Sequence, residues 1–405
     1  MITPRERRIL LITCFGHFMS HFNMLVFPAL VMPLTAQMHI GIARVLELSF
    51  WMYLFFGLTA LPWGMLADRW GARRLMMLFF LGAGVSCLAA ALWVDNPPLF
   101  KLALAFLGLF AGIYHPAGLG LISREFEHVG LGMGYNGMAG NLGLAAAPLL
   151  TGIINWFWGP RTVYLVLALL NTAGIALMLA FPLSESPRAR ETPGAGDNGN
   201  LKAFLILLAA MMLGGIAYRG TTVILPAYFE LKTGGILQSL SHLAGRALSG
   251  NVVATAVTSV IFMVGIFGQY VGGRAAQRFD ARYCYLLFHM ITIPAVFLMT
   301  VTTNLPLAAL SMVYFFFLLG MQPPENTLVA RFSSRRLHHS AYGIKFVMTF
   351  GVGALAVKLV ERIEKAWGIE YTFAALGCVS ILLVCIILVL IRNTGAPGPA
   401  AAEAK

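Results

Sequence analysis

The chain has 405 residues, of which 59% are hydrophobic and only 11% are charged, and its mean hydropathy is +0.80. Soluble globular proteins carry about 25% charged residues. The composition therefore excludes a soluble enzyme and a soluble nucleic-acid-binding protein, although the net charge is +12. In a membrane protein, a basic excess marks the cytoplasmic loops rather than a nucleic-acid partner.

Apolar stretches long enough to cross a bilayer as helices follow one another along the whole chain. They show no ten-residue alternation, which excludes the strands of a membrane barrel. We therefore predict an all-α integral membrane protein with twelve transmembrane helices. The predicted spans are 9–33, 43–67, 75–94, 99–123, 131–155, 161–183, 201–229, 250–276, 283–302, 305–330, 340–364 and 370–391.

The basic residues fall unevenly on the two faces that these spans define. With the N-terminus inside, 18 of the 28 Lys and Arg residues lie on the cytoplasmic face and 7 on the other face. Three remain inside spans, namely Arg219, Lys345 and Lys358. The positive-inside rule then predicts that both termini are cytoplasmic. We expect a multi-pass protein of the plasma membrane, which in a bacterium is the inner membrane.

A polar stretch rich in Pro, Gly and charge, residues 184–200, divides the spans six and six. We predict an N-terminal six-helix bundle over 1–183, a cytoplasmic linker over 184–200, a C-terminal six-helix bundle over 201–392 and a disordered tail over 393–405. Three pairs of similar segments relate the halves in order: 21–29 with 219–227, 64–74 with 273–283, and Gly112 and Pro116 with Gly320 and Pro324. Two parallel six-helix repeats are typical of secondary transporters.

The loop between the second and third spans has the sequence GMLADRWGARR. It resembles the loop signature of the major facilitator superfamily. That resemblance implies a fold of two pseudo-symmetric six-helix bundles and transport by alternating access. It also implies a conformational latch centred on Asp68; alternatively, the arginines of the loop only determine topology. The signature residues in place are Gly64, Asp68, Arg69, Gly71, Arg73 and Arg74.

The fifth span carries a second motif, which resembles the antiporter motif of proton-coupled exporters. Its matching residues are Gly134, Gly143, Pro148 and Gly152, whereas Ala147 and Thr151 stand where the motif has glycines. Ordinary packing of small residues between helices is an equal alternative. In the fourth span, Gly108 stands near the place of an arginine that drug exporters usually carry. This departure argues against a standard drug–proton antiporter.

Segments 16–30, 114–118 and 134–152 also resemble the fosmidomycin-resistance-like branch of the superfamily. That branch shows a histidine and then a carboxylate in the first span, and His-Pro followed by a carboxylate in the fourth. This chain keeps His17 and His115-Pro116. His21 and Ala117 stand where the acids are expected, so the coupling mechanism of the branch is not carried over.

Arg219 lies about 18 residues into the seventh span, and its repeat equivalent is His21. A charge at the bilayer centre costs about 2.5–3.5 kcal/mol, which makes such residues functional candidates. In this fold the first and seventh spans face each other, so the two cationic groups should meet and favour an anionic substrate. The alternative is a structural arginine bonded to backbone carbonyls. Other polar residues expected at the substrate are Asn23, Tyr114, His115, Asn136 and Gln322.

Glu325 and Lys345 each lie ten residues from Arg335, at the tip of the loop between the tenth and eleventh spans. Antiparallel helices therefore bring them to similar depth, where an ion pair can form. Such a glutamate can carry a coupling proton, and a purely structural pair is equally compatible with the sequence. His17 is a further residue that could take part in proton coupling.

His17 and His21, one helical turn apart, have a spacing that also suits a metal ion. The spans of the N-terminal half offer no Asp or Glu at that depth, so we expect no metal and no other cofactor. The chain has no Gly-rich phosphate loop and no nucleophile elbow, so we do not expect an enzyme.

Taken together, the sequence predicts proton-coupled export, by antiport, of a small organic anion or amphipathic compound. The alternatives are an importer or uniporter of a small anionic metabolite, and a non-transporting receptor or assembly factor of the same fold. The expected partners are the lipid bilayer, a small molecule and a proton. We expect no nucleic-acid partner and a monomer.

Overall fold

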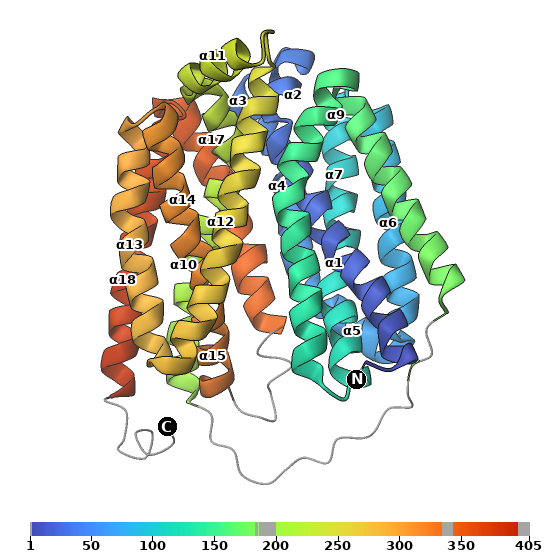
Figure 1. The fold of residues 1–405 in the computed structure, drawn as a ribbon. Helices are drawn as coiled ribbons and strands as arrows, with labels where there is room; N and C mark the ends of the chain where they lie inside the picture. Colours follow the sequence, from blue (N-terminus) through green and yellow to red (C-terminus); the bar gives the residue numbers. More distant parts are fainter. Residues whose placement is uncertain (1, 183–184, 186–199, 334–342, 396–405) are drawn as a thin grey trace.

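The helices of the two halves of the chain form two bundles that lie side by side (Figure 1). The computed structural model describes residues 2–182, 185, 200–333 and 343–395, and it is all-helical within these ranges. Apart from Glu185 and Asn200, the predicted linker 184–200 lies outside the described residues. The predicted tail lies outside them from residue 396 onward. Helix α1 begins and α18 ends at the same end of the molecule, which we call the terminal end; we call the opposite end the far end.

The first half contains ten helical elements in chain order. They are α1 (Pro4–Ala29), α2 (Val31–Met38), α3 (Ile42–Leu48), α4 (Phe50–Leu58), α5 (Ala60–Trp70), α6 (Ala72–Leu92), α7 (Pro97–Ala111), the π-helical turn η1 (His115–Leu119), α8 (Gly120–Glu125) and α9 (Val129–Ala180).

The second half contains a matching series. It consists of α10 (Leu201–Lys232), α11 (Gly234–Leu243), α12 (Gly250–Arg278), α13 (Ala281–Val301), α14 (Asn304–Gly320), α15 (Gln322–Phe332), the π-helical turn η3 (Val347–Gly351), the 3₁₀ turn η4 (Val352–Ala354), α17 (Leu355–Trp367) and α18 (Tyr371–Thr394). Helix α11 lies across the far end (Figure 1).

Within the described residues, ten helices are long and apolar enough to cross a membrane, or eleven if a bent helix pair is one span. The sequence predicted twelve; once the bent pair Val31–Met38 and Ile42–Leu58 is counted as one span, a difference of one remains, and it arises in α9. This element runs for 52 residues and covers both the fifth and the sixth predicted spans. At Gly159 its backbone leaves helical geometry, with φ 77° and ψ 173°. Glycine adopts such a positive φ without steric cost, so the chain can turn there between two membrane crossings.

The two repeated loops start their following helices with different carboxylates. Helix α6 begins after Gly71 (φ 90°), and the Glu185 carboxylate accepts hydrogen bonds from the backbone N–H groups of Ala72 (3.1 Å) and Arg73 (2.7 Å). At the equivalent place in the second half, Asp280 is itself the N-cap of α13. Both arrangements satisfy N–H groups that a helix start leaves without partners.

Helices α9 and α12 join the halves along their length. The Leu149 backbone N–H donates to Ser259 Oγ at 2.9 Å, and the Asn141 amide donates to the Gln269 side chain at 2.8 Å. A Cβ atom added at Gly152 would lie 2.0 Å from Thr255 Oγ1. The two helices therefore approach so closely that an alanine at this contact would require Thr255 to move.

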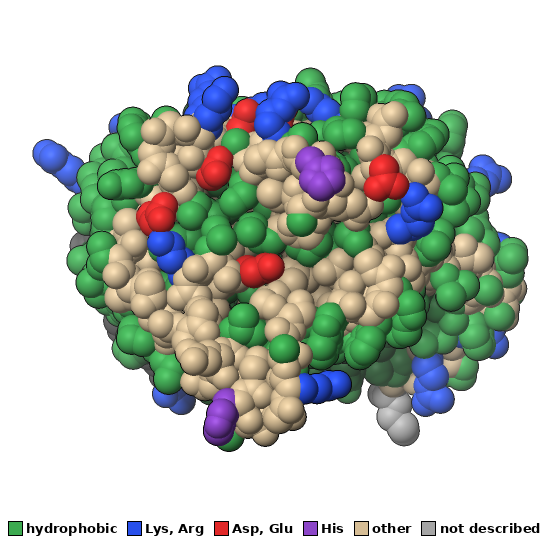
Figure 2. Space-filling model, turned by 90° about the horizontal axis from the view of Figure 1, so that it is seen from above, with side chains coloured by type: hydrophobic (Ala, Val, Ile, Leu, Met, Phe, Trp, Pro, Cys, Tyr) green, Lys and Arg blue, Asp and Glu red, His purple; other side chains and the backbone are tan. Residues whose placement is uncertain are grey.

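At the far end, further contacts close the halves against each other. Lys358 Nζ of α17 lies 3.6 Å from the Glu47 carboxylate of α3, and Asn251 Nδ2 donates to the Ala29 carbonyl at 2.9 Å. Seen from this end, several acidic side chains lie next to basic ones (Figure 2). The molecule is therefore shown with its two halves in contact at the far end.

Candidate functional site

Local helix geometry positions three histidines in the first half. His17 and His21 are one turn apart on α1, so both project from the same face. His115 opens the π-helical turn η1, which follows the end of α7 and contains Pro116. Single π-helical turns often occur at functional sites because they re-aim side chains. His115 is 6% exposed, whereas His17 and His21 are half-buried.

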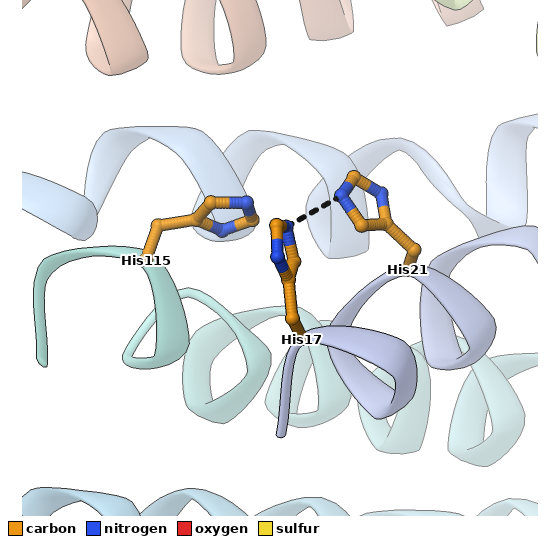
Figure 3. Close-up of side chains that lie close together, drawn as sticks. All are labelled: His17, His21 and His115. Atoms are coloured by element: carbon orange, nitrogen blue, oxygen red, sulfur yellow. Dashed lines mark hydrogen bonds between the residues drawn. The ribbon is translucent and has the colours of Figure 1, made fainter. Parts of the chain in front are cut away.

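The three imidazole rings point toward one another (Figure 3). His17 Nε2 lies 3.1 Å from His21 Nε2. The ring centroids of His17 and His115 are 5.3 Å apart, and those of His21 and His115 are 5.5 Å apart. One nitrogen from each ring lies within 4.8 Å of the other two. The sequence predicted the pair on α1 and expected His115 at the substrate, but not that the three rings would meet.

Asn136 and Tyr114 hold this histidine cluster in place. The Asn136 backbone carbonyl and its side-chain Oδ1 lie 2.9 Å and 2.8 Å from His17 Nδ1. Asn136 Nδ2 donates to the Tyr114 hydroxyl at 2.7 Å, and that hydroxyl donates to the Thr13 carbonyl at 2.8 Å. The Tyr114 ring also stacks on His17. These two predicted site residues therefore orient the cluster.

Arg219 lies where the halves meet. It belongs to α10 and is 3% exposed. Its guanidinium lies over the ring of Tyr53 from the first half, 3.9 Å from the centroid, and its charge is close enough to act on His21. Among the described residues, Arg219 Nε has no hydrogen-bond partner. The structure thus brings Arg219 and His21 into one region and leaves part of a buried cation available.

Glu325 and Lys345 form the ion pair that their spacing from the loop tip led us to expect. Lys345 Nζ lies 2.8 Å from Glu325 Oε1, and both side chains are largely buried. Lys345 also contacts the Asn326 side chain. The Tyr285 hydroxyl donates to Glu325 Oε2 at 3.0 Å. Both oxygens of the carboxylate are therefore bound within the second half, apart from the histidine cluster.

Two residues expected at the substrate are engaged elsewhere. Asn23 is 1% exposed and exchanges amide hydrogen bonds with Asn171 of α9, at 3.2 Å and 3.4 Å. It lies two residues from His21, and thus on another face of α1. Gln322 accepts a hydrogen bond of 2.9 Å from Gln269, which in turn bonds Asn141 across the halves. Both residues join helices to one another in this structure.

The signature loop packs at the terminal end of the first half. A Cβ atom at Gly64 would meet Pro116 Cβ at 3.4 Å. Arg69 lines a surface hollow of about 410 Å³ together with Thr59 and Trp63. The carboxylate that caps α6 is Glu185, which also lies 3.7 Å from Arg124. In this loop we expected a latch centred on Asp68, and nothing in the local sequence identifies Glu185 as the cap.

The glycines of the antiporter-type motif divide into two groups. A Cβ atom at Gly143 would lie 2.3 Å from the Phe18 carbonyl of α1, and Gly152 makes the equally close contact with α12. At Gly134 there is no heavy atom within 4 Å. Close helix packing therefore requires glycine at Gly143 and Gly152, and it does not explain Gly134. The packing alternative is supported for part of the motif.

Sequence reasoning missed Tyr53 and Tyr285, the aromatic partners of Arg219 and Glu325. Each is fully buried in an apolar helix, where one aromatic residue resembles any other in the sequence. It also missed the pairing of Lys358 with Glu47, because that contact joins distant segments. We expected no metal from the pair on α1, and the structure adds His115 as a third imidazole close to His17 and His21.

A comparison with protein families decides what kind of protein carries this site. The model of the Major Facilitator Superfamily matches residues 11–358. The chain belongs to the major facilitator superfamily. The expectation of a multi-pass membrane transporter, rather than an enzyme, is confirmed by this assignment.

Solved structures of other transporters share the fold. A bacterial homologue of the human lysosomal transporter Spinster, in an inward-facing and unoccupied conformation, is 15% identical with a TM-score of 0.79, and the match covers 98% of this chain and 99% of that one. The nucleoside transporter NupG is 13% identical with a TM-score of 0.75, covering 95% and 100%. At these identities the likeness shows the fold alone.

Two curated relatives are closer in sequence to this superfamily member. The puromycin resistance protein pur8 of Streptomyces alboniger is 33% identical over 147 residues, which are 34% of this chain and 27% of that protein. The uncharacterized MFS-type transporter YybF of Bacillus subtilis (strain 168) is 25% identical over 371 residues, or 86% of this chain and 84% of that protein. The match to pur8 thus spans about a quarter of its length.

Proposed function

We propose that this transporter exports a small organic anion, or an amphipathic compound with an anionic group, in exchange for protons. The proposed substrate class rests on the surroundings of Arg219. Its cation is buried between the halves, it acts on His21, and part of its guanidinium has no partner among the described residues. A planar guanidinium with free N–H groups binds carboxylate or phosphate oxygens well.

The proposed coupling group is Glu325. It is the carboxylate bound by Lys345 and Tyr285 inside the second half. Protonation of Glu325 would break the ion pair and leave Lys345 free to move with its helix, whereas deprotonation would restore the pair. A proton is thereby linked to a helix–helix contact within the second bundle, so proton binding can shift the populations of that bundle's conformations.

Export is the proposed direction, because pur8 is a resistance protein and the fifth span carries the antiporter-type motif. We also propose membership of the fosmidomycin-resistance-like branch, which the segments around His17, His115 and Gly143 support. His21 replaces the acid of that branch in the first span, so the proton site proposed here lies in the second half instead. We also propose that both termini lie on the cytoplasmic side of the membrane and that the protein is a monomer.

Purified protein in liposomes tests the proposal. Uptake of radiolabelled organic anions is measured with and without a pH gradient, for the wild type and for Arg219→Gln and Glu325→Gln. We expect pH-driven transport in the wild type and loss of all anion transport in Arg219→Gln. Glu325→Gln should keep anion exchange and lose uphill transport. Transport that needs no pH gradient would instead favour a uniporter or importer, and unaltered anion transport in Arg219→Gln would exclude the anion site.

A further inference from the structure

The histidine cluster has a second property that does not depend on the proposed anion transport. Three imidazole nitrogens, one each from His17, His21 and His115, lie within 4.8 Å of one another. In a tetrahedral zinc site the bonds to nitrogen are about 2.0–2.1 Å, so ligand nitrogens lie about 3.3 Å apart. The nitrogens of His17 and His21 are 3.1 Å apart. We propose that these three histidines bind a first-row transition-metal ion such as Zn²⁺.

The tautomer of His17 supports this proposal. Its Nδ1 faces two oxygens of Asn136, and the backbone carbonyl among them can only accept a hydrogen bond. Nδ1 therefore carries the proton, and Nε2 presents its lone pair toward His21. Metal-bound histidines are held in this way, with the outer nitrogen donating to a carbonyl or carboxylate. Asn136, itself fixed by Tyr114, takes the role of that outer partner.

His21 and His115 complete the site with small adjustments. Without an ion, His21 Nε2 donates its proton to His17 Nε2. To bind a metal, His21 moves that proton to its own Nδ1, so the ring stays neutral and Nε2 becomes a ligand. The rings have to approach by at most about 1.5 Å to reach tetrahedral spacing. His115 opens a π-helical turn, a local geometry that is frequent at functional sites.

The ligand types determine which ions are expected. Three imidazoles suit Zn²⁺, Co²⁺, Ni²⁺ and Cu²⁺, whereas Mg²⁺ and Ca²⁺ prefer oxygen ligands. Three protein ligands also leave one position of a tetrahedral ion open. Because the charge of Arg219 acts on His21, it also opposes a bound dication. Removal of this charge should therefore strengthen metal binding, which is opposite to its expected effect on anion transport.

The test uses full-length protein with a tag that contains no histidine, stripped with a chelator and then titrated with Zn²⁺ or Co²⁺. We expect one ion per chain, a visible absorption band of tetrahedral Co²⁺, and no competition by Mg²⁺. His17→Ala, His21→Ala and His115→Gln should each lose the bound ion. Asn136→Ala removes Oδ1 but keeps the backbone carbonyl that accepts from His17 Nδ1, so it should weaken binding less than the loss of a ligand does. Arg219→Gln should bind at least as tightly as the wild type.

His289→Ala is the matched control, because His289 is a buried histidine of α13 in the other half. It should retain the ion, and thermal unfolding of each variant reports that the fold is intact. No retained ion in the wild type would overturn the proposal, and so would equal binding in His17→Ala. If the cluster variants lose metal binding but keep Arg219-dependent anion transport, both proposals stand and are independent of each other. If the wild type binds the ion but transports no anion in an Arg219-dependent way, the metal site stands and the proposed function fails.

Discussion

The guanidinium of Arg219, from the second half of the chain, lies 3.9 Å from the centroid of the Tyr53 ring in the first half. The Tyr53 hydroxyl donates to the Met24 carbonyl at 3.0 Å, so α1 fixes the ring beneath the cation. A buried cation is thus held between the halves by an aromatic face. The Nε–H group of Arg219 has no hydrogen-bond partner among the described residues, so it stays available for a ligand.

The first prediction separates the ring of Tyr53 from its hydroxyl. Cation–π contacts contribute about 0.5–2 kcal/mol. Tyr53→Leu should therefore weaken anion binding by about 2- to 30-fold, because Arg219 loses its support. Tyr53→Phe keeps the ring and should bind almost as the wild type does. Isothermal titration with the transported anion measures both, and equal affinity in the Leu and Phe variants would contradict the role of the ring.

The second prediction concerns the stability of the Glu325–Lys345 pair. Removing one partner of a buried ion pair costs about 3–5 kcal/mol, because the other charge remains uncompensated, whereas replacing both is often nearly neutral. Glu325→Gln and Lys345→Met should each lower the thermal unfolding midpoint strongly, and the double variant should recover most of the loss. Additive losses in this double-mutant cycle would show that the two side chains do not interact.

The third prediction concerns the glycine contacts of α9. Gly152→Ala should slow transport and cost about 1–3 kcal/mol, because the new Cβ would lie 2.0 Å from Thr255 Oγ1. The additional substitution Thr255→Ala removes that oxygen and should restore part of the activity. Gly134→Ala is the control, since nothing lies within 4 Å and alanine favours a helix. Transport rates and unfolding midpoints are measured for all three; loss of function in Gly134→Ala alone would point to a role of the motif other than packing.

The fourth prediction is a pH dependence at the terminal end. Hydrogen bonds from Arg282 hold the pKa of Asp280 below its ordinary value of 3.8. The stabilisation is therefore fully present above pH 3.8 and is lost as the pH falls through the lowered pKa. Asp280→Asn keeps an N-cap acceptor but loses the charge. It should be less stable than the wild type at neutral pH and should lose less stability in acid.

Thermal unfolding at neutral and acidic pH measures this difference. Arg282 lies 2.6 Å from Asp280 and its side chain is 1% exposed, so the pair is shielded better than a surface ion pair. If the wild type and Asp280→Asn lose stability in parallel as the pH falls, Asp280 does not contribute the acid dependence.

The sequence alone determined the fold, because a bilayer imposes strong local rules. Each span must be long, apolar and helical, and loop arginines and internal repeats are visible without tertiary structure. The same rules identified Arg219, Glu325 and Lys345, since a charge inside an apolar stretch is conspicuous. The equal spacing of Glu325 and Lys345 from one loop tip was enough to predict their contact, which the structure contains at 2.8 Å.

Only the tertiary structure decided which side chains share a site. Contacts between helices that lie far apart in the chain depend on how each helix is rotated, and one residue of rotation turns a side chain by about 100°. The sequence therefore could not place His115 against His17 and His21, nor Tyr53 beneath Arg219. It could not show that the amide of Asn23 is occupied by Asn171. The apolar pattern of the sequence predicts where each helix lies along the chain, whereas packing between helices decides which face of a helix lines the site.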